Sequence, residues 1–247
     1  MALEETVLDG ENMTNLLKAN WDISCASYRK LPIGTANCFT VNDGSNTYFL
    51  KEYQSYIEDC DIIREENILE KLKNYEIPST DFIETVSREK MVKYKGHRFV
   101  LQKYMSGQSY GYNDFPEEML PQMAVMLAKI HIALKDMELP VDMDAAWVNG
   151  DAVSKYDNIL EVLEQHREDS LYKQIKEDLL YKRTVLQKNQ DIFRRYFEGI
   201  TYSPSHGDYQ GCQIIGENNR IKAVIDFTSA RKLPVVWELM RSFVQTS

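Results

Sequence analysis

The first hundred residues alternate between apolar and polar positions with the short period of β-strands. Such runs cover residues 23–29, 38–41, 47–53, 82–86, 90–94 and 97–104. Asn42-Asp43-Gly44-Ser45 and Lys95-Gly96 have the composition of tight hairpin turns. Residues 56–75 instead repeat apolar side chains at helical spacing, and residues 1–20 give a short amphipathic helix at best. The pattern predicts a small antiparallel sheet accompanied by one substantial helix.

After Ser106-Gly107 the period changes to that of helices. Apolar residues on one face mark a helix that begins near Pro116: Met119, Leu120, Met123, Leu127, Ile130 and Leu134. Further helices are expected at residues 152–165, 170–197 and 235–244. Between the last two, strands at residues 213–215 and 221–225 flank a turn at residues 216–219. Strands followed by helices predict an α+β fold.

Composition and charge narrow the class of protein. The chain has 247 residues, of which 43% are hydrophobic and 27% charged, values typical of globular domains. Its net charge of −9 argues against a nucleic-acid partner. The four cysteines have neither paired spacing nor a histidine partner, which indicates free thiols in a reducing compartment. The acidic start is no signal peptide, and no run approaches the roughly 18 apolar residues of a membrane span. We therefore expect a cytoplasmic protein without a membrane partner.

Two carboxylates flank the hairpin predicted at residues 213–225. Asp208 precedes its first strand and Asp226 follows its second strand, so both are expected at the same end of the hairpin. Phosphoryl transfer uses such a pair, with one carboxylate to take the hydroxyl proton and one to hold Mg²⁺ on the nucleotide phosphates. The alternative is a surface hairpin with incidental acidic ends.

Lys51 occupies an otherwise apolar strand. It alternates with Phe49 and Tyr53, so all three share one face of that strand. A charge among aromatic side chains needs a partner, and Glu65 and the adjacent Glu66 in the following helix could supply it. The alternatives are a solvated edge lysine and a surface helix rich in glutamate. The turn at residues 31–37 could cover a nucleotide, although its one glycine also suits an ordinary turn.

Several ordered motifs resemble those of the aminoglycoside phosphotransferase and choline kinase family. They are Leu127-Ala128-Lys129-Ile130-His131, His206-Gly207-Asp208, Gln213 at the position of the family's asparagine, and Ile225-Asp226-Phe227. The resemblance runs from about residue 23 to the C-terminus. It implies a protein-kinase-like fold of two lobes: a small antiparallel-sheet lobe at residues 1–105, which binds nucleotide, and a mostly helical lobe at residues 106–247, which carries the catalytic loop.

The resemblance also implies roles for single residues. Asp208 is expected to be the catalytic base, and Asp226 and Gln213 are expected to bind Mg²⁺. Lys51, partnered by Glu65, would hold the nucleotide phosphates. The hinge segment would run from Gln102 to Tyr104, and its backbone groups would meet the adenine base.

The function expected from the resemblance is transfer of the γ-phosphate of ATP or GTP, with Mg²⁺, to a hydroxyl of a small molecule. The acceptor could be an aminoglycoside, an amino alcohol such as choline, a sugar or homoserine. A catalytically silent kinase-like binding or structural protein, for example one associated with a spore coat, is the alternative, because Gln213 departs from the family pattern.

The end of the chain carries a further expectation. Family members usually continue with more helices after Ile-Asp-Phe, so the resemblance implies a helical lobe that is truncated at Ser247. A truncated gene product, a fragment and a short member all fit this pattern. The final helix is too apolar for one buried face, so part of it should be exposed or covered by a second copy of the chain in a homodimer.

Overall fold

The computed structural model describes residues 6–32, 36–111, 114–142 and 152–244. The chain divides into two compact units. The first unit comprises Met1–Lys135, His206–Ala230 and Arg241–Ser247, and the second comprises Asp136–Ser205 and Arg231–Met240. The division into lobes at residue 105 remains a prediction.

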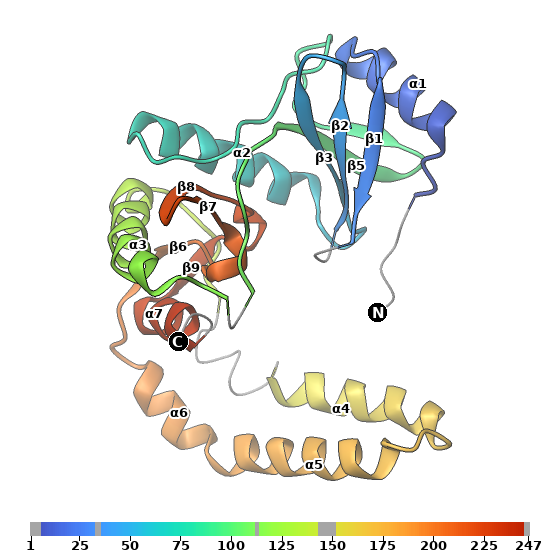
Figure 1. The fold of residues 1–247 in the computed structure, drawn as a ribbon. Coiled ribbons are helices and arrows are strands. Elements are labelled where there is room, and N and C mark those ends of the chain that lie inside the picture. Colours follow the sequence, from blue (N-terminus) through green and yellow to red (C-terminus); the bar gives the residue numbers. More distant parts are fainter. Residues whose placement is uncertain (1–5, 33–35, 112–113, 143–151, 245–247) are drawn as a thin grey trace. The chain divides into compact units, whose positions relative to one another are not determined.

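The first unit contains a five-stranded antiparallel sheet (Figure 1). Its strands, in spatial order, are β1 (Ser27–Leu31), β2 (Asn37–Asn42), β3 (Thr47–Tyr53), β5 (His97–Lys103) and β4 (Val92–Tyr94). The hairpin predicted between β2 and β3 is confirmed, because the two strands pair antiparallel with Asn42 opposite Thr47. In its turn the Asp43 carboxylate accepts hydrogen bonds from the Ser45 and Asn46 N–H groups at 2.8 and 2.6 Å. The strand predicted at residues 82–86 is wrong. Only Phe82 makes a bridge, to Gln102.

Helix α1 (Gly10–Trp21) covers one face of this sheet. Its buried side chains join those of β2, β3 and β5 in one core: Met13, Leu16, Leu17 and Trp21 with Phe39, Val41, Leu50, Phe99 and Leu101. The Asp9 carboxylate caps the helix by accepting from the Asn12 N–H at 2.8 Å. Each large apolar side chain buried in this way stabilises the fold by about 1.5–3 kcal/mol. Tertiary packing therefore makes a full helix of a segment whose own pattern is weak.

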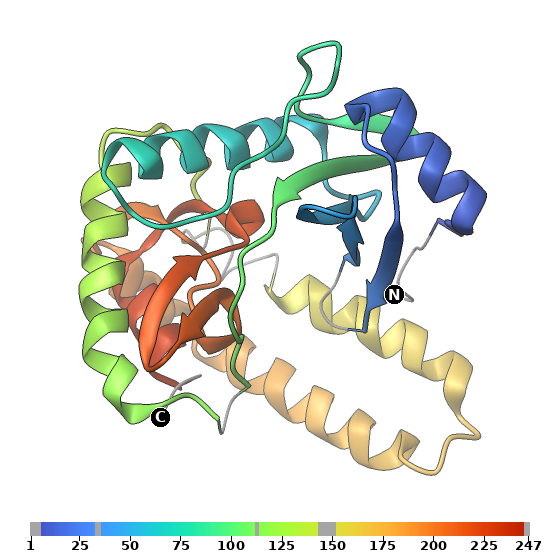
Figure 2. The same cartoon turned by 45° about the horizontal axis from the view of Figure 1, so that its top comes forward.

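The remaining elements of the first unit carry the site. Helix α2 (Asp59–Asn74) contacts both helix α3 (Leu120–Leu134) and the 3₁₀ turn η5 (Phe227–Ser229). Figure 2 shows α3 beside the hairpin of β7 (Ile214–Glu217) and β8 (Arg220–Val224). The Tyr209 hydroxyl donates to the Met123 carbonyl at 2.8 Å. This hydrogen bond connects the loop before β7 to α3. Met119, directly before α3, and Met123, within it, are buried as core.

The second unit contains α4 (Ala152–Leu163), α5 (Tyr172–Lys188), α6 (Gln190–Phe197), and the strand pair β6 (Tyr202–Ser205) and β9 (Arg231–Pro234). The single helix predicted at residues 170–197 is interrupted at Asn189, whose side chain donates to the Val185 carbonyl at 2.7 Å. The sequence did not predict the β6–β9 pair, because four-residue strands that contain proline lack a clear alternating pattern.

Helix α7 (Val235–Val244) matches its predicted range, and the boundary between the two units falls within it. It exposes a set of large apolar side chains: Val236, Trp237, Leu239, Met240 and Phe243. The predicted exposure is confirmed, and the homodimer remains a prediction. Among the described residues, no helix combines the length and apolar content needed to cross a membrane.

Candidate active site

Lys51 on β3 lies at the centre of a buried cluster of charges. Only 8% of its side chain is exposed. Its Nζ donates to Asp226 Oδ1 at 2.8 Å and to Thr228 Oγ1 at 3.0 Å, and lies 3.9 Å from Glu65 Oε2. Burial alone would lower the pKa of Lys51, but the Asp226 and Glu65 carboxylates outweigh burial and raise it. Lys51 is therefore a charged interior residue and not an edge lysine.

Glu65 connects α2 to both β3 and the turn that follows β8. Its Oε2 accepts from the Tyr53 hydroxyl at 2.8 Å, and its Oε1 accepts from the Phe227 N–H at 3.2 Å. Thr228 Oγ1 lies 2.8 Å from Glu65 Oε2 and 2.8 Å from Asp226 Oδ1, so it donates its one proton to one of these carboxylates. Burial, followed by the neighbouring Glu65, raises the pKa of Tyr53 and keeps its hydroxyl a donor. Glu66, the alternative partner of Lys51, instead lies 3.7 Å from Lys90.

Asp226 stands where the chain leaves β8 and begins η5. Its backbone is left-handed, with φ 64° and ψ 67°, a conformation that aspartate tolerates better than most residues. Burial would raise the pKa of its carboxyl group, but the Lys51 ammonium and the Thr228 hydroxyl lower it to about 2. With 40% of its side chain exposed, this ionised carboxylate can still meet a ligand.

The loop that carries Asp208 is in contact with the turn that carries Asp226. His206 is fully buried, and its Nε2 donates to the Ile225 carbonyl at 3.0 Å. The other ring nitrogen, Nδ1, accepts from the Asp208 N–H at 3.3 Å, so the ring connects the Asp208 loop to the end of β8 and positions the loop. Gly207 has φ +84°, and a Cβ there would lie 2.0 Å from the Ser229 carbonyl oxygen. Only glycine fits at this crossing.

Asp208 is held by three side chains. Its Oδ1 accepts from Gln210 Nε2 at 3.0 Å, from Arg241 Nε at 2.7 Å, and from Arg241 Nη2. Its Oδ2 accepts from Gln213 Nε2 at 3.1 Å. Because a carboxylate only accepts, the Gln213 amide nitrogen must face Asp208, and its amide oxygen faces elsewhere. The Ile225 N–H donates to the Gln213 carbonyl at 3.0 Å, which places Gln213 beside the strand that leads to Asp226.

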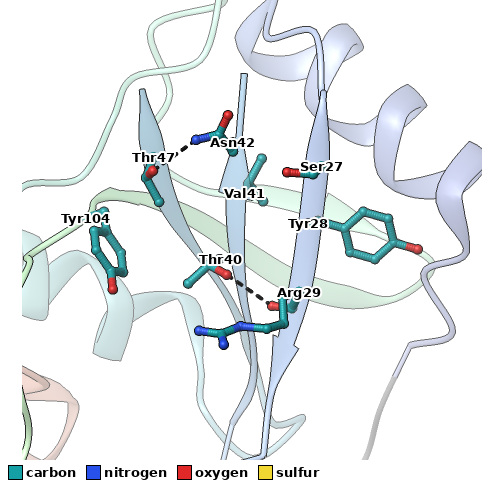
Figure 3. Close-up of a pocket in the computed structure, with 8 residues that line it drawn as sticks. All are labelled: Ser27, Tyr28, Arg29, Thr40, Val41, Asn42, Thr47 and Tyr104. Atoms are coloured by element: carbon teal, nitrogen blue, oxygen red, sulfur yellow. Dashed lines mark hydrogen bonds between the residues drawn. The ribbon is translucent and has the colours of Figure 1, made fainter. Parts of the chain in front are cut away.

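The face of the sheet that carries Lys51 continues into a pocket. In the register of the strands, Phe49 faces both Thr40 and Gln102, and Arg29 faces Thr40. These four residues form a row across the sheet. Phe49, its member on β3, is two residues from Lys51, or about 7 Å along the strand. Beyond it lies a pocket of about 320 Å³, lined by Ser27, Tyr28, Arg29, Thr40, Val41, Asn42, Thr47 and Tyr104. Figure 3 shows Arg29 and Thr40 on the side of the sheet that carries Tyr104, whereas Tyr28 points to the other side.

Part of the backbone of the expected hinge segment already has partners within the protein. The Lys103 N–H donates to the Asp81 carbonyl at 2.9 Å, and the Lys103 carbonyl accepts from the Thr80 hydroxyl at 2.8 Å. Gln102 is buried. Tyr104, just past the end of β5, has no backbone hydrogen bond to any residue that the structure describes. The glycine turn expected to cover a nucleotide includes residues 33–35, which lie outside the described residues.

Comparison with known proteins places the chain in a family. Residues 27–245 match the model of the phosphotransferase enzyme family, APH. The chain belongs to this family. The expected family, fold class and enzyme class are therefore confirmed. A search of curated proteins found no match.

Solved structures of other phosphotransferases have the same fold. A spectinomycin phosphotransferase in complex with ADP and spectinomycin has a TM-score of 0.69 at 16% identity, over 93% of this chain and 71% of that one. An amicoumacin kinase in complex with AMP-PNP and Ca²⁺ has a TM-score of 0.68 at 11% identity, over 96% and 69%. A microcompartment-associated aminopropanol kinase has a TM-score of 0.62 at 13% identity, over 95% and 74%.

The chemistry of the donors suits the metal that this phosphotransferase family implies. Asp226 offers a carboxylate and Gln213 an amide oxygen, both of which are ligands that Mg²⁺ takes. In the part of the chain that the structure describes, no group of three or more His, Cys, Asp or Glu residues forms a complete metal cage. Mg²⁺ is commonly bound by one or two protein ligands and completes its shell with water and substrate phosphates. The residues present therefore fit Mg²⁺.

Sequence reasoning missed two members of the site, Thr228 and Arg241. Thr228 follows directly after the Ile225-Asp226-Phe227 motif, so its closeness to Asp226 in the sequence was a usable signal. Arg241 lies 33 positions from Asp208 on α7. Its signal was a cation on a helix that is otherwise mostly apolar, and only the folded chain identifies the carboxylate that it meets.

Proposed function

We propose that this chain is a small-molecule kinase that transfers the γ-phosphate of ATP or GTP to a hydroxyl group. The observation that carries this proposal is the contact between Lys51 and Asp226, which are 175 positions apart and are joined by a 2.8 Å hydrogen bond in an otherwise buried cluster. Structural ion pairs can also be buried, but here the Asp226 turn touches the loop of a second carboxylate, Asp208. Family membership adds independent support.

The protein would act mainly by positioning groups and neutralising charge. Asp208 takes the proton of the acceptor hydroxyl, and its Oδ2, with one hydrogen bond from Gln213, still has room to accept it. Lys51 holds the nucleotide phosphates and is kept in place by Glu65 through Thr228. Asp226 and Gln213 would hold Mg²⁺, which when bound neutralises charge on the phosphates.

The nucleoside would lie on the sheet face next to Lys51. Phe49 offers an aromatic ring in the adjacent row, and the open backbone groups of Tyr104 could pair with the base. The pocket bounded by Arg29 and Thr40 continues along the same face. The nucleotides in the spectinomycin phosphotransferase and amicoumacin kinase structures support use of an adenine nucleotide.

Two measurements test this proposal. The first follows the melting temperature with Mg-ATP and with Mg-GTP, and the second measures phosphate transfer to a panel of hydroxyl acceptors. Asp208→Asn should keep the stabilisation by nucleotide and lose turnover by about 10²–10⁴-fold, the usual contribution of a general base. Glu217→Gln, on the exposed end of the β7–β8 hairpin, is the matched control and should change neither.

Unchanged turnover in Asp208→Asn would remove this residue from the mechanism. Stabilisation by nucleotide without transfer to any acceptor would favour the catalytically silent binding protein. The Gln213 geometry favours the enzyme, because one amide can face Asp208 with its nitrogen and a metal with its oxygen.

A further inference from the structure

We propose that Arg241 forms an oxyanion subsite beside the catalytic carboxylate, and that the acceptor therefore carries a carboxylate or phosphate close to its reactive hydroxyl. This inference rests on the proposed function and names its substrate class. It would separate this chain from kinases whose acceptors are cationic amines.

The orientation of the guanidinium is the first reason. Arg241 approaches Asp208 with its Nε and Nη2 groups, and both bonds end on the same oxygen, Oδ1. A guanidinium has five N–H donors in a planar fork. Its Nη1 group makes no hydrogen bond to any residue within the described parts of the chain, and 31% of the Arg241 side chain is exposed. One edge of the fork therefore remains open to a ligand.

The second reason is the position of that edge relative to the reacting hydroxyl. Oδ1 of Asp208 already accepts from both Gln210 and Arg241, whereas Oδ2 accepts from Gln213 alone. The acceptor hydroxyl therefore bonds to Oδ2, next to the oxygen that Arg241 occupies. A hydroxyl on Oδ2 and an oxyanion on the open edge of Arg241 lie within the length of one small molecule.

The third reason is charge. The Arg241 ion pair neutralises Asp208, so this carboxylate offers little net attraction to a cationic acceptor. The second carboxylate, Asp226, is similarly paired with Lys51. An oxyanion would instead gain charge-assisted hydrogen bonds from a planar fork that matches carboxylate and phosphate geometry. Hydroxy acids, hydroxy amino acids and sugar phosphates satisfy both requirements.

The test compares acceptors that carry the oxyanion with matched acceptors that lack it. The wild-type protein is assayed with Mg-ATP on hydroxy acids and their primary amides, and on sugars and their phosphates. We expect kcat/KM to be at least tenfold higher for the anionic member of a pair. The carboxylate and phosphate pairs identify which oxyanion is used.

Variants then assign the preference to Arg241. Arg241→Gln should lower kcat/KM for the anionic acceptor by about tenfold or more, the equivalent of one charge-assisted hydrogen bond. The neutral acceptor should lose less, because it loses only the support that Arg241 gives to Asp208, so the ratio of kcat/KM between the two acceptors should fall by about tenfold. Arg241→Lys should retain part of the preference. Arg220→Gln removes an exposed arginine from the β7–β8 hairpin of the same unit and should change neither acceptor.

Three outcomes would overturn the inference: equal use of the two members of each pair, preference for a cationic acceptor, and equal loss on both acceptors in Arg241→Gln. The last would place Arg241 on the transferred phosphoryl group or on Asp208 alone. If Arg241→Gln fails to fold, the comparison of acceptors on the wild-type protein still decides. Transfer to neutral acceptors without a charge preference refutes only the oxyanion subsite, whereas failure to bind nucleotide and to phosphorylate any acceptor refutes the proposed kinase.

Discussion

Replacement of Gly207 by alanine tests whether the Asp208 loop and the Asp226 turn depend on their close contact. A Cβ at Gly207 would lie 2.0 Å from the Ser229 carbonyl oxygen and 2.7 Å from its carbon. Ordinary contact begins at 3.4 Å, so the two segments must separate by about 1.4 Å. The neighbour is backbone and cannot rotate away, so the η5 turn that follows Asp226 must move.

Gly96 supplies a matched control in the same compact unit. Its φ of +83° equals that of Gly207 within one degree, but a Cβ there would have nothing within 4 Å. In Gly96→Ala the left-handed backbone costs about 1–2 kcal/mol. The stiffer unfolded chain offsets about 0.4–1 kcal/mol of this, so we expect a net loss of at most about 1.6 kcal/mol.

Gly207→Ala should lose the same amount and, in addition, about 1–3 kcal/mol for overpacking. Urea unfolding of both variants measures this difference. Phosphate transfer should fall by on the order of 10²-fold in Gly207→Ala, because an error of about 1 Å in the position of catalytic groups has that effect. It should stay near the wild-type rate in Gly96→Ala. Equal destabilisation of the two variants, or full activity of Gly207→Ala, would refute the claim that this contact sets the geometry.

Three further predictions concern Lys51, Asp226 and Gln213. Lys51→Met should stay folded, since Met keeps most of the apolar stem. It should weaken Mg-ATP binding or turnover by roughly 10–100-fold, as expected for a lost charge-assisted hydrogen bond. Normal nucleotide kinetics in this variant would contradict the prediction. The carboxyl pKa of Asp226 is lowered from 3.8 to about 2, so its contribution to stability is present above pH 4 and is lost as the pH falls toward 2. That shift corresponds to about 2.4 kcal/mol at most, and to about 1 kcal/mol once the 40% exposure of the side chain is taken into account. Urea titrations at pH 6 and pH 2.5 should therefore show that Asp226→Asn loses less free energy of unfolding between these pH values than the wild type does. Gln213→Asn should have equal or lower turnover at every Mg²⁺ concentration, because the shorter side chain loses the 3.1 Å hydrogen bond to Asp208. A tenfold gain in turnover would instead indicate that Gln213 marks a decayed site.

Features that depend on short-range geometry could be predicted from the order of the residues alone. The turn at Asn42–Ser45 and the helix α7 follow from local composition and spacing. Lys51 shares a face with Tyr53, and its Nζ lies 4.5 Å from the centroid of that ring, because side chains two apart on a strand always point the same way. Asp208 and Asp226 come together because a hairpin returns the chain to the end where it began.

Contacts between side chains that are distant in the sequence depend on how the elements pack. Glu65 and Glu66 are neighbours in sequence, yet successive residues of a helix differ in direction by about 100°, so the packing of α2 alone selects Glu65. In the same way, only the folded chain directs Arg241 to Asp208 and shapes α1 into a full helix. These contacts join segments far apart in the chain, and their free energy comes from burial and charge pairing that exist only after the segments pack. No local period encodes them, and for this reason the acceptor class had to be inferred from the structure.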